Sequence, residues 1–111
     1  MNQDEYQNII AIAEHYGYES QSRQLIEEMA KLTVAINKLW RVEKFCDGKN
    51  IMDVKGFSYP EVKEIIGEIA DTEIMLAQIK HLLGCNDEVE LEKERKILRQ
   101  LERMKEEVEG E

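Results

Sequence analysis

The chain has little of several features that define other protein classes. Its 111 residues include only two cysteines and one proline, and aromatic side chains make up 6% of it. So few aromatics argue against a β-sandwich or a β-barrel, because strands are enriched in them. Neither Cys46 nor Cys85 has a partner at metal-ligand spacing, and two cysteines indicate no disulfide framework. We therefore interpret both as free thiols in a reducing compartment.

Long apolar runs and an excess of positive charge are also missing. No apolar stretch approaches the ~20 residues that a membrane span needs, and no signal peptide is present. We therefore expect a cytoplasmic protein that has no membrane partner. The 15 lysines and arginines are outnumbered by 24 acidic residues, which leaves a net charge of −9. Nucleic acid is not an expected partner, because its phosphates demand a basic surface.

The sequence does contain apolar residues at helical spacing, in a composition that is 42% apolar and 35% charged. This composition is typical of a helix-rich protein, and the length favours a single domain. We predict an all-α fold, a bundle of about four helices that oligomerisation completes, because a helical domain this small often gains stability from its own copies. The predicted helices span residues 4–16, 21–45, 60–83 and 87–108, and residues 46–57 form a long loop.

Glycine, proline and capping residues mark the expected helix ends. Gly17 ends the first helix, and Gly84 is a typical residue after the end of the third. Ser58 to Glu61 form a capping box with proline in the first turn of the third helix. Asn86 or Asp87 then caps the last helix. We expect residues 1–84 to form the helical domain and residues 85–111 a charged helix that packs on the bundle or on a partner subunit.

Two helices carry carboxylates within their apolar stripes. Glu28 lies inside the stripe of the second helix, which consists of Leu25, Met29, Leu32, Ile36 and Leu39. Glu68 lies in the middle of the stripe of the third helix, which consists of Val62, Ile65, Ile66, Ile69, Leu76, Ile79 and Leu83. Asp71 sits at the edge of this second stripe. Desolvating a carboxylate costs several kcal/mol, so Glu68 in particular needs a cation, a proton or a metal ion.

The carboxylates are spaced to meet at one point. Glu68 and Asp71 are three residues apart and share a helix face, and Glu28 can face the same point from the neighbouring helix. Three carboxylates that converge in a helical bundle suit Mg²⁺, with Mn²⁺ as a substitute. The chemistry implied is metal-assisted attack of water on a phosphoanhydride. By position, Glu27 or Glu28 orients the attacking water.

This arrangement resembles the MazG-like all-α nucleoside triphosphate pyrophosphohydrolases, a group that includes the dimeric dUTPases. Their pattern is Glu-Glu-x-x-Glu on one helix and Glu-x-x-Asp on the next. The matching segments here are Glu27-Glu28-Met29-Ala30-Lys31 and Glu68-Ile69-Ala70-Asp71, and the resemblance covers residues 15–84. It implies cleavage of a nucleoside triphosphate to the monophosphate and pyrophosphate, and assembly as a homodimer or homotetramer. The metal ligands it implies are Glu28, Glu68 and Asp71.

A substrate of this class needs further contacts. Cations that face the leaving pyrophosphate and an aromatic ring that stacks on the base are expected, although each candidate is more often a plain surface or packing residue. The candidates are Lys38, Lys55 and Lys80 for the phosphates, and Trp40, Phe57 and Tyr59 for the base. His15 and His81 have no partner at ligand spacing, so we expect surface or helix-end positions for both.

Lys31 departs from the family pattern, because it stands where the family has a metal-binding glutamate. A protonated lysine cannot bind Mg²⁺, and it can pair with Asp71 or Glu68 in place of the metal ion. Three alternatives follow. The site binds one Mg²⁺ through its three carboxylates at reduced affinity, or Glu27 or Glu64 replaces the missing ligand, or the chain is a helical oligomerisation or regulatory module whose catalysis is impaired or lost.

Overall fold

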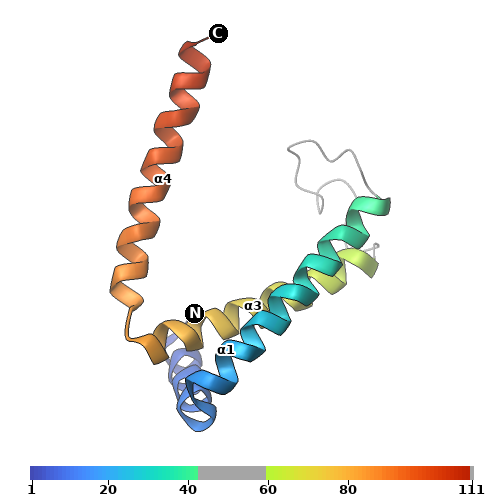
Figure 1. The fold of residues 1–111 in the computed structure, drawn as a ribbon, viewed down its shortest axis with the longest axis vertical. Helices are drawn as coiled ribbons and strands as arrows, with labels where there is room; N and C mark the ends of the chain where they lie inside the picture. The colour runs from blue at the N-terminus through green and yellow to red at the C-terminus, as the bar shows by residue number, and fades with distance from the viewer. Residues whose placement is uncertain (43–59, 111) are drawn as a thin grey trace.

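The computed structural model describes residues 1–42 and 60–110. Within these ranges the regular elements are the helices α1 (Gln3–Val42), α3 (Pro60–Leu83) and α4 (Asn86–Glu109), so the all-α prediction is confirmed. Helices α1 and α3 run antiparallel, side by side, and α4 leads away from them (Figure 1). None of the described helices is long and apolar enough to cross a membrane.

Helix α1 contains both of the first two predicted helices. The predicted boundary at Gly17 is present as a kink, because this residue has φ 86° and ψ 168° in an otherwise helical run. Glycine adopts a positive φ without a steric penalty, which explains why the change of direction falls here. The kink lets residues 3–16 fold back against the C-terminal part of α3 (Figure 1), where Ile9 and Ala13 are buried. The predicted end of the second helix, at Phe45, lies outside the described residues.

Helix α3 begins and ends as predicted. Pro60 is its first residue, and Gly84 follows its last residue with φ 64°. The backbone N–H of Gly84 donates to the carbonyl of His81, and the N–H of Cys85 donates to the carbonyl of Lys80, each over 3.0 Å. These two bonds form a Schellman motif, which satisfies the last carbonyls of the helix. The Ser58 side of the predicted capping box lies outside the described residues.

The predicted cap of the last helix is wrong. Helix α4 already includes Asn86, and Cys85 occupies the N-cap position without a side-chain cap bond. The Asn86 amide instead donates to the hydroxyl of Tyr6 over 3.0 Å, which ties the start of α4 to the N-terminal part of α1. Asn86 is thus used for a tertiary contact, and Cys85 is a half-buried free thiol, as predicted.

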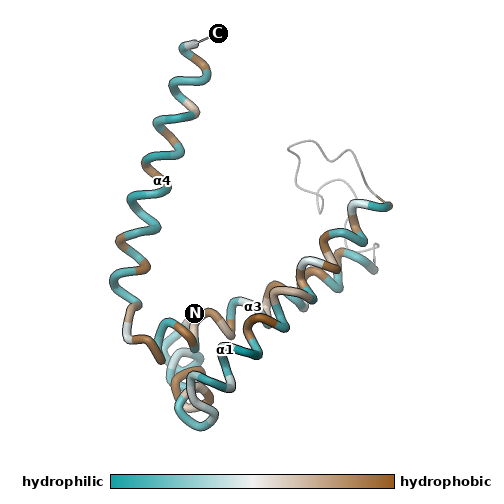
Figure 2. Tube along the Cα trace, viewed as in Figure 1, coloured by the Kyte–Doolittle hydropathy of each residue, from teal (hydrophilic) through white to brown (hydrophobic). Residues whose placement is uncertain are grey.

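Beyond its first turn, α4 has no extensive packing against the other described residues. None of its residues is buried, and apolar positions recur along it among charged ones (Figure 2). Packing of this helix on the bundle of the same chain is therefore not observed, and packing on a partner subunit stays a prediction. The exposed apolar residues are Leu91, Ile97, Leu98, Leu101, Met104 and Val108.

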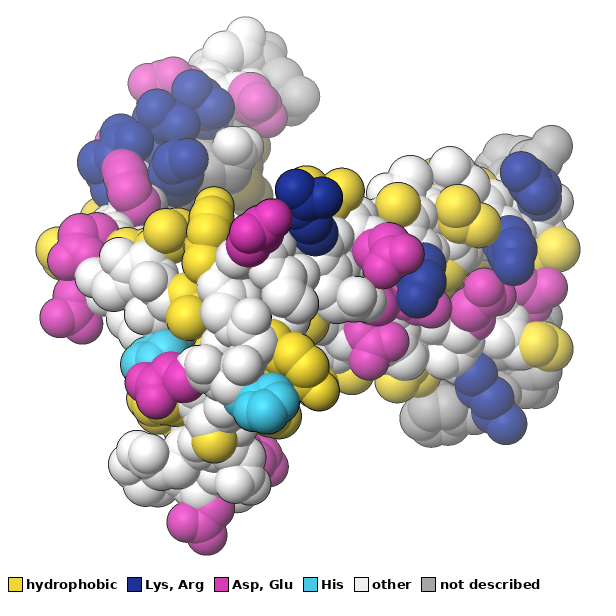
Figure 3. Space-filling model, turned by 60° about the horizontal axis from the view of Figure 1, so that its bottom comes forward, with side chains coloured by type: hydrophobic (Ala, Val, Ile, Leu, Met, Phe, Trp, Pro, Cys, Tyr) yellow, Lys and Arg dark blue, Asp and Glu magenta, His cyan; other side chains and the backbone are white. Residues whose placement is uncertain are grey.

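The core lies between α1 and α3, and it is small. Its buried apolar residues are Ile9, Ala13, Ala35, Val62, Met75 and Ala77. About half of the residues in the apolar stripes around Glu28 and Glu68 are exposed, and apolar side chains are visible on the surface (Figure 3). The reason is that a two-helix hairpin covers only a narrow strip of each helix, whereas these stripes are broad arcs. The stripe residues that are exposed in the single chain are Met29, Ile36, Ile66, Ile69, Leu76 and Leu83.

Candidate metal centre

The structure brings Glu28, Glu68 and Asp71 together between α1 and α3. Each offers a carboxylate oxygen, and these oxygens lie within 4.8 Å of one another. Glu28 is buried, Glu68 is half-buried and Asp71 is exposed. The cluster therefore has a closed side on α1 and an open side on α3, which a ligand can reach from solvent.

Two oxygens of this cluster lack hydrogen-bond donors. Glu28 Oε2 and Glu68 Oε2 are buried side-chain atoms with no partner among the described residues. Buried polar atoms are nearly always paired, so each such atom requires an explanation. A set of carboxylate oxygens is the ligand type that Mg²⁺ and Mn²⁺ prefer. A hard divalent cation therefore fits the residues present and would satisfy both oxygens.

The other oxygen of Glu28 is held by its own helix. The Nε2 of Gln24 donates to Glu28 Oε1 over 2.8 Å, and the ammonium of Lys31 donates to the same oxygen over 3.4 Å. Gln24 was not predicted from the sequence, although its position four residues before Glu28 is the signal that indicates such a contact. Both donors hold the carboxylate in one orientation.

Lys31 pairs with Glu28 rather than with the predicted Asp71 or Glu68. Its side chain is 55% exposed, whereas that of Glu28 is 9% exposed, so the ammonium lies at the solvent edge of the pair. The negative charge of Glu28 raises the pKa of Lys31, followed by their hydrogen bond, and Glu27 and Glu68 add to the effect. Lys31 is therefore protonated at neutral pH and sits in an acidic environment.

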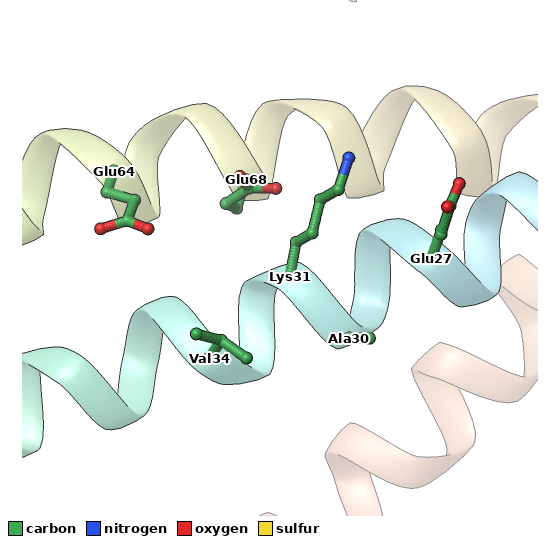
Figure 4. Close-up of a pocket in the computed structure, with 6 residues that line it drawn as sticks. All are labelled: Glu27, Ala30, Lys31, Val34, Glu64 and Glu68. Atoms are coloured by element: carbon green, nitrogen blue, oxygen red, sulfur yellow. The ribbon is translucent and has the colours of Figure 1, made fainter.

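A pocket of about 310 Å³ adjoins the cluster. Its lining residues are Glu27, Ala30, Lys31, Val34, Glu64 and Glu68 (Figure 4). Figure 4 shows Lys31 reaching from α1 toward α3, between Glu68 and Glu27. The volume is within the range of small-molecule sites. Lys31 is the single cationic side chain among these described lining residues.

The remaining predicted residues lie away from the cluster. Lys38 pairs with Glu64 over 3.1 Å, so Glu64 has a cation of its own and does not join the metal-ligand group. Trp40 is exposed, and Lys80 is half-buried in the last turn of α3. Three predicted candidates and one cysteine lie outside the described residues: Lys55, Phe57, Tyr59 and Cys46.

The two histidines occupy the positions expected of them. His15 is exposed, and its ring meets that of Tyr16 edge to face with the centroids 4.7 Å apart. His81 lies in the last turn of α3, where its Nε2 is 3.0 Å from Glu14 Oε1. Neither histidine belongs to the carboxylate group that the described residues form.

Comparison with protein-family models, with curated proteins and with solved structures finds no match for this chain. The resemblance to the MazG-like group therefore depends on the two sequence motifs. Any function assigned to the chain depends on its own residues and their geometry.

Proposed function

We propose that this protein is a Mg²⁺-dependent nucleotide pyrophosphohydrolase that cleaves a nucleoside triphosphate to its monophosphate and pyrophosphate. One observation carries the proposal: Glu28, Glu68 and Asp71 converge within 4.8 Å, and two of their buried oxygens have no partner among the described residues. Carboxylates that serve only the fold are normally hydrogen-bonded when buried. The two motifs that resemble those of the MazG-like group support the same function.

The residues divide into a metal-binding side and a substrate side. Glu28, Glu68 and Asp71 would hold the ion, which supplies neutralisation of phosphate charge and a lower pKa for a bound water. Glu27 lines the pocket beside this group, and we assign it the role of accepting a proton from the attacking water. The triphosphate would occupy the pocket, next to Lys31.

The assembly proposed is a homodimer or homotetramer that buries an apolar face of the hairpin. Met29 and Ile36 are seven residues apart on α1, and Ile69, Leu76 and Leu83 repeat at the same interval on α3. All five are exposed. Seven-residue spacing is typical of helices that pack against other helices. On a helical projection this face lies beside the carboxylate cluster, roughly 60–100° around each helix from Glu28 or Glu68, so a partner that covers it would lie next to the site.

The alternative function is a helical oligomerisation or regulatory module that lacks catalysis. The contact between Lys31 and Glu28 over 3.4 Å favours it, because a cation of the chain itself already balances the most buried carboxylate. In that case the cluster is a structural ion-pair network, which often contributes no more stability than apolar packing.

Pyrophosphate release distinguishes the two functions. We would incubate the natural chain, Lys31→Glu and Glu68→Gln with canonical and modified nucleoside triphosphates and Mg²⁺ or Mn²⁺. Release by the natural chain that Glu68→Gln abolishes would support the hydrolase. Release by Lys31→Glu alone would identify the natural chain as the non-catalytic module, and silence of both would contradict hydrolysis of the nucleotides tested. Glu73→Gln is the control, because Glu73 is an exposed glutamate on the same helix.

A further inference from the structure

Lys31 both contacts the carboxylate cluster and lines the pocket beside it. We propose that Lys31 is a tethered counter-cation: it balances Glu28 in the metal-free site, and it turns to the phosphates of a polyphosphate substrate when a divalent ion binds. This inference deepens the proposed function and rests on it. It assigns a substrate-binding role to the residue that departs from the family pattern.

The contacts of Glu28 leave room for a second cation. Gln24 and Lys31 both donate to Glu28 Oε1, whereas Glu28 Oε2 has no donor among the described residues. The lysine therefore satisfies one side of the carboxylate only. A metal ion at Oε2 does not displace Gln24, which holds the carboxylate in place through its 2.8 Å bond.

The charge of the site fits one divalent ion. The carboxylates of Glu28, Glu68 and Asp71 together with the ammonium of Lys31 carry a net charge of −2. A glutamate in place of Lys31 would make the group considerably more negative. Buried charge is tolerated when it is compensated, so the lysine adjusts the site to a single divalent ion.

The ion pair between Lys31 and Glu28 is long and lies at the surface, so it breaks easily. Its 3.4 Å length exceeds the roughly 2.7–2.9 Å of strong charge-assisted bonds. The ammonium lies on the exposed side of the pair, at the end of a flexible four-carbon stem. A divalent ion repels it at short range, and rotation of the stem carries the charge outward without a change in the helix.

The ammonium of Lys31, once displaced from Glu28, would lie in the pocket. Three of its lining residues are glutamates, namely Glu27, Glu64 and Glu68, and Lys31 is the single cation among the described residues that line it. A polyphosphate that enters with its metal ion meets repulsion chiefly from Glu27, because Glu64 pairs with Lys38 and Glu68 would hold the ion. Lys31 offsets part of this repulsion, since an ammonium is a strong point-charge ligand for phosphate. The substrate class is thus a metal-bound polyphosphate.

Isothermal titration of Mn²⁺ and then of Mn²⁺–tripolyphosphate tests the exchange. The proteins compared are the natural chain, Lys31→Met, Glu68→Gln and the control Lys63→Met. Lys31→Met should bind Mn²⁺ alone about tenfold more tightly, the size of the repulsion between the two cations at ~5 Å in water-like screening. It should bind Mn²⁺–tripolyphosphate about tenfold more weakly, because the phosphates lose their cation. Lys63→Met removes an exposed lysine of α3 that does not line the pocket, and it should change the affinity for Mn²⁺ less than twofold.

The outcomes separate this inference from the proposed function. If Glu68→Gln abolishes Mn²⁺ binding and Lys31→Met leaves it unchanged, the metal site stands. The role of Lys31 as a counter-cation would then be overturned. Tighter binding of both Mn²⁺ and Mn²⁺–tripolyphosphate by Lys31→Met would overturn the phosphate contact. No Mn²⁺ binding by any variant would overturn both the inference and the metal site.

A double-mutant cycle of Lys31→Met and Glu28→Gln in metal-free buffer tests the ion pair itself. The two changes should couple by about twofold to fivefold in the unfolding equilibrium constant, and additivity would contradict the pairing.

Discussion

Gln21 and Gln78 form a buried hydrogen bond between α1 and α3, in which Gln21 Nε2 donates to Gln78 Oε1 over 2.7 Å. Gln78 is the most buried large side chain among the described residues, at 2% exposed. Seven residues along α1 from Gln21 lies Glu28, and seven residues back along the antiparallel α3 from Gln78 lies Asp71. The amide pair therefore joins the two helices in the same register that brings the carboxylates to one level.

Replacing one member of this pair should destabilise the fold and loosen the site. Gln78→Leu leaves the buried Gln21 amide without its partner, and we expect a loss of about 1–3 kcal/mol in the free energy of unfolding. Urea denaturation followed by circular dichroism measures this loss. Gln21→Leu combined with Gln78→Leu should cost less than the two single changes together, because no amide is then left unpaired.

The matched control is Gln7→Leu, since Gln7 is an exposed glutamine of α1. Its effect should stay within about 0.5 kcal/mol. Equal effects of Gln7→Leu and Gln78→Leu would contradict a stabilising role of the buried amide pair.

Local signals in the sequence predicted the helices well. Gly17 and Gly84 adopt a positive φ that other residues rarely take, and Pro60 fixes its own φ, so all three mark a kink or a helix end in the structure. The convergence of Glu28 with Glu68 and Asp71 was also predictable, because helical spacing sets which side chains share a face.

The tertiary contacts were harder to predict from the sequence. Spacing alone does not tell which part of a broad apolar arc packs within the chain, and Ile69 and Leu76 of the predicted stripe are exposed. Gln21 and Gln78 were missed because glutamine is usually exposed. The seven-residue spacing from Gln21 to Glu28 was the available signal. Both helices carry carboxylates that Lys31 could pair with, and residue spacing alone does not predict which one it contacts.

Glu28→Gln should separate metal binding from folding. The change removes a charged ligand, so the dissociation constant for Mn²⁺ should rise roughly a hundredfold. The free energy of unfolding in metal-free buffer should stay the same or rise, because a neutral amide costs less to bury than a carboxylate. Calorimetric titration and urea denaturation give the two quantities, and Glu73→Gln should alter neither.

A different result for Glu28→Gln would assign Glu28 to the fold. A loss of roughly 3 kcal/mol in the free energy of unfolding, with Mn²⁺ binding unchanged, is the signature of a broken structural ion pair. That outcome would support the non-catalytic module.

The apolar face of the hairpin should control the oligomeric state. Leu76→Glu places a charge in the line that also contains Ile69 and Leu83, so the molar mass measured by light scattering should fall to that of a single chain. Ile74→Glu is a closely matched control on the same helix, because Ile74 is 41% exposed and Leu76 is 44% exposed. Ile74 lies on a different face and should leave the mass unchanged. Equal masses for the natural chain and Leu76→Glu would contradict this interface.

The contribution of Lys31 to stability should be independent of pH across the neutral range. Glu28 raises the pKa of Lys31 above its usual value of 10.5. A raised folded-state pKa contributes stability that is fully present below the unfolded-state pKa and is lost as the pH rises through the folded-state pKa. The destabilisation caused by Lys31→Met in metal-free buffer should therefore be the same at about pH 6 and about pH 9, and it should shrink only above the usual pKa of lysine.

Urea denaturation at each pH measures this destabilisation. Lys63→Met is the control, because Lys63 is exposed on α3. An effect of Lys31→Met that vanishes between about pH 7 and about pH 9 would mean that the ammonium is not held by Glu28 in solution.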